Sequence, residues 1–402
     1  MRCESTIVKL KDLCIGGKGK YGIPASAVPY NENLYTYLRI TDITDDGRIN
    51  KSGLVSVDDE KASEYLLQPN DIVFARTGGS TGRNYFYDGT DGEFVYAGFL
   101  IKFSIDPNRV NPRYVKYYCQ SKQYRDWVNS FNTGSTRGNI NAQTYAGMEF
   151  PLPNRKQQDL LVDTLSALDD KIELNNKINE NLEQQAESIF KAWFVDCIPF
   201  GNEVPHTWKM VTLNDLTKLI SRGIAPKYTE NSHEWVINQK CIRNHMVDTS
   251  LARKHVPKAV NEKWLRYGDL LINSTGEGTL GRTAQIWFDP EHLTVDSHVT
   301  IVRPAKENLI YYIGFWGLQH EREIEALHTG STGQTELPRE RVKAMQLYRP
   351  DEETLCHFTE IIAPLTAAIV VNQKENEKLA TTRDVLLPKL MSGEIDASTL
   401  RV

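Results

Sequence analysis

The feature that most constrains the fold of this chain is an internal repeat at a spacing close to 200 residues. Pro69–Gly79 (PNDIVFARTGG) returns as Tyr267–Glu277 (YGDLLINSTGE), and Asn132–Thr136 (NTGST) returns as His328–Thr332 (HTGST). Three further matches keep the same order: YLRITDI with WVINQKCI, the Gly-Arg pairs at 82–83 and 281–282, and NPRYVKYYCQS with NLIYYIGFWGLQ. One shared tetrapeptide would mean little, but ordered matches at nearly one offset predict two copies of a single unit.

Each copy divides into a mixed domain and a long helix. The first part alternates short β-branched and aromatic runs, such as DIVFAR and HVTIVR, with Gly, Asp, Asn and Pro. Helical segments lie between these runs, which is typical of an α+β domain. We therefore expect a domain at 1–152, a helix at 153–200, a second domain at 201–350, and a helix with a tail at 351–402.

The two helical segments carry a heptad pattern of apolar residues. The first seam is Leu161, Leu165, Leu168, Ile172, Asn175, Asn179, Leu182, Ala186, Ile189 and Trp193, and the second is Ile362, Leu365, Ile369, Asn372, Asn376, Leu379, Arg383 and Leu386. Spacings that alternate between three and four predict a coiled coil. A pseudo-twofold axis between the copies requires the helices to run antiparallel. Asn175, Asn179, Asn372 and Asn376 should then meet and fix the register. Pro364 is expected to mark the first turn of the second helix or a kink there.

Charge and composition narrow the class of protein. The net charge of −5 is spread as +1, −4, +2 and −4 over 1–150, 151–200, 201–350 and 351–402. Such a balance is unlike that of a generic polyanion binder, whose domain is basic. The six cysteines are scattered without a CxxC pair, which favours buried free thiols in a reducing compartment. We find no signal peptide and no apolar run of about 18 residues, so we expect a cytoplasmic protein that spans no membrane.

A search for catalytic motifs yields little. All nine histidines lie at or beyond His206, so no histidine role can be common to both copies. The GxGxxG string at Gly17–Gly22 is followed by Ile-Pro rather than by a helix, and we interpret it as a turn-rich basic loop. NPRY at Asn111–Tyr114 faintly resembles an adenine methyltransferase signature, but the cap of a helix is the better interpretation. No ATP loop, nuclease constellation or metal-ligand spacing is present.

The two domains share glycine-rich polar loops that hold arginines. RTGGSTGR corresponds to STGEGTLGR, and NTGSTRGNINAQT corresponds to HTGSTGQTE. Ser, Thr, Asn and backbone N–H groups bind phosphates, and Arg can bind guanine with two hydrogen bonds. Plain hairpin turns would explain any one of these residues, but the recurrence of both loops favours nucleic-acid binding by the set. The candidate DNA-binding residues are Lys18, Lys20, Arg76, Thr77, Ser80, Arg83, Ser135, Arg137, Asn139, Arg222, Lys227, Thr275, Arg282, Ser331 and Gln334.

The helical segments resemble those of a known family. LVDTLSALDDKIELNNKINENLEQQAESIFKAWFVD and the tail LLPKLMSGEI are similar to the conserved regions of the specificity subunit of type I restriction–modification enzymes. The order of domain, helix, domain, helix matches that family along the whole chain. The match of the second helix is looser.

The resemblance implies a subunit without catalytic activity. Each domain would be a target recognition domain that reads one half of a bipartite, non-palindromic DNA site. The helices would set the spacing of the half-sites and bind two modification subunits, and restriction subunits where these exist. The resemblance places S-adenosylmethionine, ATP and Mg²⁺ on those partners and leaves this chain without a cofactor.

Two other functions remain open from the sequence. One is a stand-alone DNA adenine methyltransferase that uses NPRY, and the other is a coiled-coil scaffold that does not bind DNA.

Overall fold

The computed structural model divides the chain into two compact units, and each is described by itself. Unit 1 comprises Met1–Ile172 and Glu377–Val402, and unit 2 comprises Glu173–Asn376. The residues that the structure describes are 5–131, 138–276, 278–330 and 335–396. The candidate residues Ser135, Arg137, Ser331 and Gln334 therefore lie outside the described part of the chain.

Unit 1 contains two four-stranded sheets with orders β2-β9-β6-β7 and β3-β5-β4-β8, and a ribbon of β1 paired with β10. Pairing is antiparallel except between β4 and β8. The strands are β1 (Thr6–Lys9), β2 (Lys20–Tyr21), β3 (Ala27–Val28), β4 (Tyr35–Leu38), β5 (Val55–Val57), β6 (Asp71–Ala75), β7 (Asn84–Tyr87), β8 (Phe94–Tyr96), β9 (Leu100–Ser104) and β10 (Glu149–Leu152). Three short helices are α1 (Pro112–Tyr118), α2 (Lys122–Asn129) and α3 (Ala142–Ala146).

Unit 2 repeats this order. Its sheets are β12-β20-β17-β18 and β16-β13-β19, the ribbon pairs β11 with β21, and β14 and β15 form a hairpin. The strands are β11 (Lys209–Thr212), β12 (Thr217–Arg222), β13 (Trp235–Ile237), β14 (Ile242–Arg243), β15 (Met246–Val247), β16 (Arg253–Lys254), β17 (Leu270–Asn273), β18 (Thr283–Gln285), β19 (Leu293–Val295), β20 (Val299–Pro304) and β21 (Gln346–Arg349). The short helices are α5 (Ile310–Gln319), α6 (Glu321–Ala326) and α7 (Arg339–Lys343).

The two copies agree in detail, which confirms the predicted repeat. The pair β13–β19 is parallel, like β4–β8. Asp71 opens β6 and accepts a hydrogen bond of 2.8 Å from the Gln68 N–H. Asp269, just before β17, accepts one of the same length from the Arg266 N–H. Both carboxylates are buried and paired with a cation of the neighbouring strand, Lys102 at 2.8 Å in unit 1 and Arg303 at 2.7 Å in unit 2. A buried carboxylate requires such a partner.

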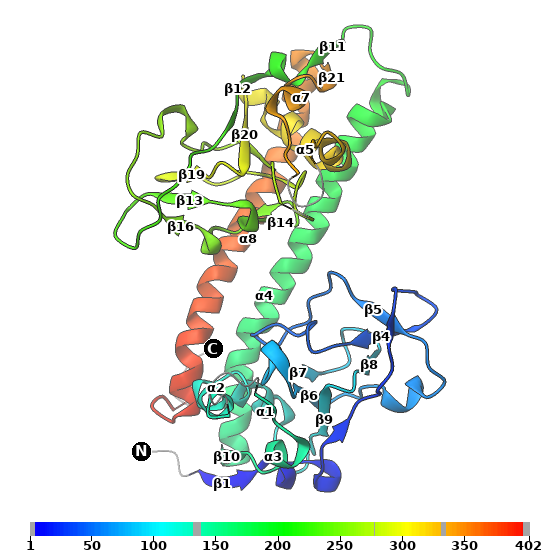
Figure 1. Cartoon of the computed structure of the whole chain (residues 1–402), viewed down its shortest axis with the longest axis vertical. Helices are drawn as coiled ribbons and strands as arrows, with labels where there is room; N and C mark the ends of the chain where they lie inside the picture. The colour runs from blue at the N-terminus through cyan, green and yellow to red at the C-terminus, as the bar shows by residue number, and fades with distance from the viewer. Residues whose placement is uncertain (1–4, 132–137, 277, 331–334, 397–402) are drawn as a thin grey trace. The chain divides into compact units, whose positions relative to one another are not determined.

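The long helices α4 (Arg155–Phe190) and α8 (Glu352–Met391) run antiparallel, as predicted. They are the green and the orange-to-red helices of Figure 1. In unit 2, Asn372 Nδ2 donates to Asn179 Oδ1 at 2.8 Å. Asn175 Nδ2 donates to Asn376 Oδ1 at 2.9 Å. The residue number rises on one helix while it falls on the other, so the predicted register is confirmed.

Each end of the helix pair belongs to the core of one unit. In unit 1, Leu165 of α4 and Leu390 of α8 are buried in the cluster that contains Tyr117 and Phe150. In unit 2, Phe190 of α4 and Phe358 of α8 lie in one cluster, with ring centroids 6.0 Å apart. The apolar seam therefore continues into the two domain cores.

The expectation that Pro364 marks the first turn of the second helix was wrong, whereas the alternative of a kink stays a prediction. Pro364 lies well inside α8, which continues through it, and its ring faces solvent. The missing N–H removes only one hydrogen bond of a helix whose seam is held by packing. Neighbouring Ile362 and Thr366 are fully buried.

Among the described helices, α8 contains an 18-residue window with a mean hydropathy of 1.7, long and apolar enough by composition to cross a membrane. Counting only consecutive apolar residues missed this window. The core helix of a coiled coil can satisfy the same criterion, and 33% of the window is buried inside the protein.

Candidate nucleic-acid interface

In unit 1 the two glycine-rich loops lie against each other. The Arg76 N–H donates to Phe99 O at 3.1 Å, and the Ile140 N–H donates to Arg76 O at 2.9 Å. Thr77 and Asn139 form an antiparallel bridge. Thr81 Oγ1 donates to Gly138 O at 2.9 Å. The predicted residues Arg76, Thr77 and Asn139 are thus brought together, although more than 50 residues of sequence separate the loops.

Unit 2 builds the same arrangement from the same backbone atoms. The Ser274 N–H donates to His298 O at 2.8 Å, and the Leu337 N–H donates to Ser274 O at 2.9 Å. Thr275 forms an antiparallel bridge with Glu336. Arg76, Thr77, Phe99 and Asn139 therefore correspond to Ser274, Thr275, His298 and Glu336.

Further positions complete each set, and of these the sequence analysis named only Lys20 and Arg222. The Gly22 N–H donates to Leu100 O and the Gly223 N–H donates to Val299 O, both at 3.1 Å. Tyr21 of unit 1 therefore occupies the position that Arg222 occupies in unit 2. A Cβ atom added at Gly78 would lie nearest to the Ile40 side chain. One added at Gly276 would meet Thr279 first and then the Gln239 side chain, so Ile40 corresponds to Gln239. Interface 1 is Lys20, Tyr21, Ile40, Arg76, Thr77, Phe99 and Asn139, and interface 2 is Ser221, Arg222, Gln239, Ser274, Thr275, His298 and Glu336.

Interface 1 combines a cation with exposed aromatic surface. The Arg76 guanidinium lies 5.0 Å from the centroid of the Tyr21 ring, and its Nε is buried without a hydrogen-bond partner. Phe99 is 59% exposed although it follows a buried strand. Tyr21 also accepts a hydrogen bond of 3.2 Å from the Ala142 N–H. A guanidinium held on a ring, whose Nε makes no hydrogen bond within the described residues, can bind a base edge or a phosphate.

Interface 2 presents a different set of groups on the same backbone. Thr275 Oγ1 lies 2.7 Å from His298 Nδ1 and donates to Gln239 Oε1 at 3.1 Å. Arg222 is held by an ion pair with Glu336 and by a hydrogen bond of 2.9 Å to Leu337 O. An amide and an imidazole replace the apolar Ile40 and Phe99. The two interfaces can therefore make different hydrogen bonds to a ligand.

The remaining candidates fall into two groups. Arg83 is engaged within unit 1, because its Nε lies 2.7 Å from Asp45 Oδ1 and its Nη1 donates to Ile43 O at 3.1 Å. Ser80 is buried. Lys18, Lys20, Asn139, Lys227 and Arg282 are exposed. Arg282 corresponds to Arg83, since both donate a backbone bond to the third residue before them.

The motifs that suggested catalysis have structural roles here. Asn111 caps α1, because its side chain accepts a hydrogen bond of 3.1 Å from the Arg113 N–H, as predicted. Its amide also donates to Asp159 Oδ1 at 2.8 Å. Gly22 of the GKGKYG string lies against strand β8, where a Cβ atom would be 2.2 Å from Tyr96 O. In the described part of the chain, no three His, Cys, Asp or Glu residues are placed to hold a metal ion.

Comparison with known proteins identifies the family. The sequence model described as "Type I restriction modification DNA specificity domain" matches residues 4–184. The specificity subunit of the type I restriction enzyme MjaIX of Methanocaldococcus jannaschii is 28% identical over 321 residues, which cover 74% of this chain and 72% of the relative. The chain belongs to the type I restriction–modification specificity subunits. A specificity subunit is a non-catalytic part of its complex, so the prediction that the chain is not itself an enzyme is confirmed.

Other comparisons agree with this assignment. The specificity subunit of the type I restriction enzyme HindI of Haemophilus influenzae is 19% identical over 411 residues, which cover 83% of this chain and 88% of the relative. The crystal structure of a type I restriction–modification S subunit from M. genitalium matches 96% of both chains with a TM-score of 0.60 and 16% identity. That similarity confirms the fold of two β-rich domains with two long helices.

Proposed function

We propose that this specificity subunit reads a bipartite, non-palindromic DNA site, one half with each domain. The domain at 1–152 would use interface 1 and the domain at 201–350 would use interface 2. The observation that carries the proposal is that the two units share the same backbone hydrogen bonds at the interfaces but present different side chains there. Arg76 N–H to Phe99 O in one unit matches Ser274 N–H to His298 O in the other. Equivalent positions with different hydrogen-bonding groups select different bases.

The antiparallel helices α4 and α8 would set the spacing between the half-sites. An α-helix is stiff over its length and rises 1.5 Å per residue, so the seam from Leu161 to Trp193 spans roughly 48 Å. The same helices would bind two modification subunits, and restriction subunits where the system has them. These partners would carry S-adenosylmethionine, ATP and Mg²⁺, and the complex would act in the cytoplasm. Exposed apolar side chains on both helices, such as Leu174 and Val371, support a role in binding partners.

Mapping of methylated bases across the genome tests the proposal. A host that expresses this chain with its modification subunit should methylate adenine within two short, different sequences that are separated by a fixed number of unread base pairs. A single palindromic site would contradict the assignment of one half-site to each domain. Specific methylation that persists after deletion of 201–350 would do so as well.

A further inference from the structure

The two units carry opposite charge on corresponding surfaces beside the interfaces. In unit 2, a groove of about 680 Å³ lies between the segment Gly223–Ala225 and the connection Lys258–Lys263. In unit 1, the corresponding groove lies between Ile23–Pro24 and Asp58–Lys61. Both begin next to the parallel pair of strands, at the bridges Ile23–Ala97 and Ile224–Asp296. The two grooves therefore occupy the same place in the repeated fold.

The surface in unit 2 is basic, and its cations are exposed or half-buried. We name as the basic surface the cations Lys227, Arg253, Lys254, Lys258 and Lys263 with the aromatic residues Tyr228 and Trp235. The Arg253 guanidinium lies 3.6 Å from the Tyr228 ring centroid, and the Lys254 ammonium lies 5.2 Å from that of Trp235. Both rings are more than one third exposed, at 39% and 38%. Cations interleaved with exposed aromatic rings are typical of nucleic-acid surfaces.

Two lysines of the groove keep donors available. Lys263 Nζ donates to Gly223 O at 2.9 Å, and Lys258 Nζ donates to Ala225 O at 3.4 Å. Within the described residues, neither ammonium lies within 4.0 Å of a carboxylate oxygen. Each retains two of its three N–H donors. Burial, followed by the nearby charges of Lys258 and Arg339, lowers the pKa of Lys263. The two ammonium groups therefore add positive charge to the groove, although Glu262 also lines it and Glu234 Oε2 accepts a hydrogen bond of 3.4 Å from the Lys258 backbone N–H.

The groove joins interface 2. A second hollow shares Ser221 and Lys263 with it and continues to Arg222, Glu336 and Arg339. Glu336 and Glu340 in this hollow are already engaged in ion pairs with Arg222 and Arg339. A duplex bound at interface 2 would thus pass the ammonium groups of Lys258 and Lys263, each of which keeps donors available.

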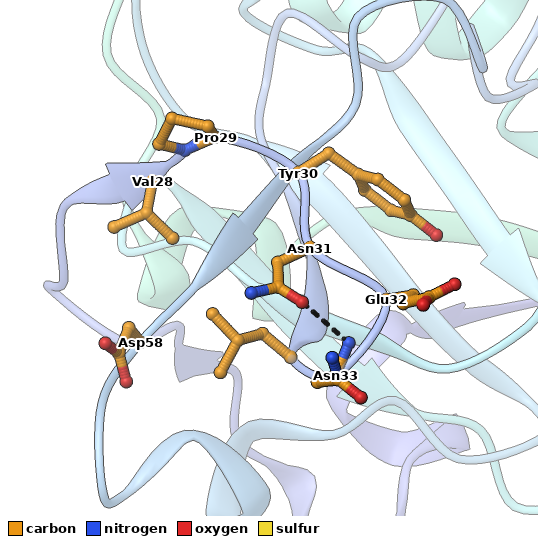
Figure 2. Close-up of a pocket in the computed structure, with 8 residues that line it drawn as sticks. Val28, Pro29, Tyr30, Asn31, Glu32, Asn33 and Asp58 are labelled. Carbon is orange, nitrogen blue, oxygen red and sulfur yellow. Dashed lines mark hydrogen bonds between the residues drawn. The ribbon is translucent and has the colours of Figure 1, made fainter.

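The surface in unit 1 has the opposite character. We name as the acidic surface Glu32, Asp58, Asp59 and Glu60, whose four carboxylates outnumber the one cation of this groove, Lys61. Figure 2 shows part of it, with the carboxylates of Glu32 and Asp58 at the rim of a hollow beside Tyr30. Ala27 and Ser56 stand on β3 and β5 where unit 2 has Tyr228 and Lys254, as the strand pairings place them. Phosphates would be repelled from this surface.

We propose that the basic surface of unit 2 is a phosphate-binding site for the DNA backbone next to the half-site read by interface 2, and that unit 1 lacks an equivalent. One domain then supplies most of the sequence-independent affinity, and the other contributes mainly by reading bases. The inference rests on the proposed function, because it assumes that interface 2 faces DNA. It explains how a chain with a net charge of −5 can bind a polyanion.

The test measures salt dependence with the full chain in complex with its modification subunits. The probe is a fluorescein-labelled duplex of arbitrary sequence, and the variant is K258Q/K263Q. Each lost phosphate contact should reduce the slope of log K against log salt by about 0.9. The difference in affinity between wild type and variant should therefore shrink about tenfold between about 50 and 200 mM salt. K227Q/K254Q on the same surface should act in the same direction.

Matched variants make the result decisive. K209Q/K218Q removes the same charge from exposed positions outside the groove and should leave the slope unchanged. D59N/E60Q on the acidic surface should raise affinity, because it removes repulsion. A slope that K258Q/K263Q does not change overturns the inference. Loss of the modification subunit with an unchanged slope would show that the surface binds an acidic protein instead. A wild-type complex that binds no duplex at all would overturn the proposed function itself.

Discussion

Asn175 of α4 donates a hydrogen bond from Nδ2 to Oδ1 of Asn376 in α8 over 2.9 Å, near the middle of a largely apolar seam. Asn175 is fully buried, and the same amide also donates to Glu375 Oε2 at 2.7 Å. Its replacement by Ala leaves these acceptors without their donor. We expect N175A to lower the free energy of unfolding by about 1–3 kcal/mol, measured by urea denaturation of the full chain.

A control on the same helix separates this effect from helix propensity. Glu180 is exposed on α4, so E180A should change stability by less than about 0.5 kcal/mol. A loss in N175A no larger than that in E180A would show that the asparagine pair does not contribute to the register.

Exchange of side chains between the interfaces tests their role in specificity. The variant Q239I/H298F gives interface 2 the apolar side chains of interface 1. Gln can bind adenine through two hydrogen bonds, whereas apolar groups contact the thymine methyl. We expect the preference at one or two base pairs of the second half-site to weaken by about 1–3 kcal/mol each, while the first half-site stays unchanged. Mapping of methylated sites in a host that expresses the variant measures both.

The neighbouring Lys240 provides the control, because it is exposed next to Gln239. K240A should leave the methylated sequence unchanged. Equal loss of discrimination at all positions of the second half-site in Q239I/H298F would indicate a collapsed loop and would contradict direct reading by these residues.

The three described arginines of the loops should behave differently. Arg76 lies over the Tyr21 ring, and its Nε has no hydrogen-bond partner within the described residues, so R76A should relax one base position by about 1–3 kcal/mol. Arg282 is exposed, and R282A should weaken binding evenly and reduce the salt slope by about one. Arg83 is tied to Asp45, so R83A should lower stability without changing the salt slope. Competition binding with duplexes that carry single substitutions distinguishes these results. Full affinity and specificity in all three variants would show that the interface lies elsewhere.

A pH dependence of stability follows from the hairpin of unit 2. His245 lies 3.5 Å from both Glu187 of α4 and Glu321 of α6, and these two carboxylates raise its pKa to about 10 against the opposing effect of burial. A raised pKa stabilises the fold fully below the unfolded value of about 6.5, and this stabilisation is lost as pH rises through about 10. Burial also raises the pKa of nearby Glu183, to about 7, and its contribution is lost in the same direction.

Replacement of His245 should remove most of this dependence. Its backbone has a φ of +60°, which Asn tolerates, and the shorter side chain does not reach the carboxylates. We expect H245N to be less stable than wild type near pH 6 and to differ less near pH 10, in urea denaturation. H206N, at an exposed histidine, is the control. A constant difference between H245N and wild type over this range would contradict the assignment.

The repeat and the helix pair could be predicted because both produce regular spacings along the sequence. An offset near 198 aligned Asp71 with Asp269, and the three-four spacing placed Asn175 and Asn179 opposite Asn376 and Asn372. Pro364 was misplaced because proline reads as a boundary in sequence, while packing of the seam keeps the helix continuous on both sides of it.

The arrangement of the candidate interface could be predicted only in part from sequence, because its residues lie at the ends of strands that are distant in sequence. Tyr21, Ile40 and Phe99 come from three separate segments, and none of them stands in the two glycine-rich loops that the copies share, although Tyr21 lies in the GKGKYG string. The sequence did contain a signal for Phe99. If the alignment of the two copies is extended to β8 and β9, Phe99 becomes equivalent to His298. Arg83 looked like a ligand residue in sequence, but Asp45, 38 residues before it, occupies its guanidinium.

The last prediction concerns the spacer between the half-sites. Asn179 meets Asn372 in the antiparallel pair, so the residue that lies opposite Asn181 is Val370. Insertion of one heptad after Asn181, with a matching heptad after Val370, preserves the seam because the pattern repeats every seven residues. It lengthens each helix by about 10.5 Å. At about 3.4 Å per base pair, the unread gap should grow by about three base pairs while both half-site sequences stay the same. Seven residues inserted into α4 alone should instead break the register and abolish methylation. Methylated-site mapping decides the matter: a folded double insertion with an unchanged gap, or with altered half-site bases, would exclude the helices as the element that sets the spacing.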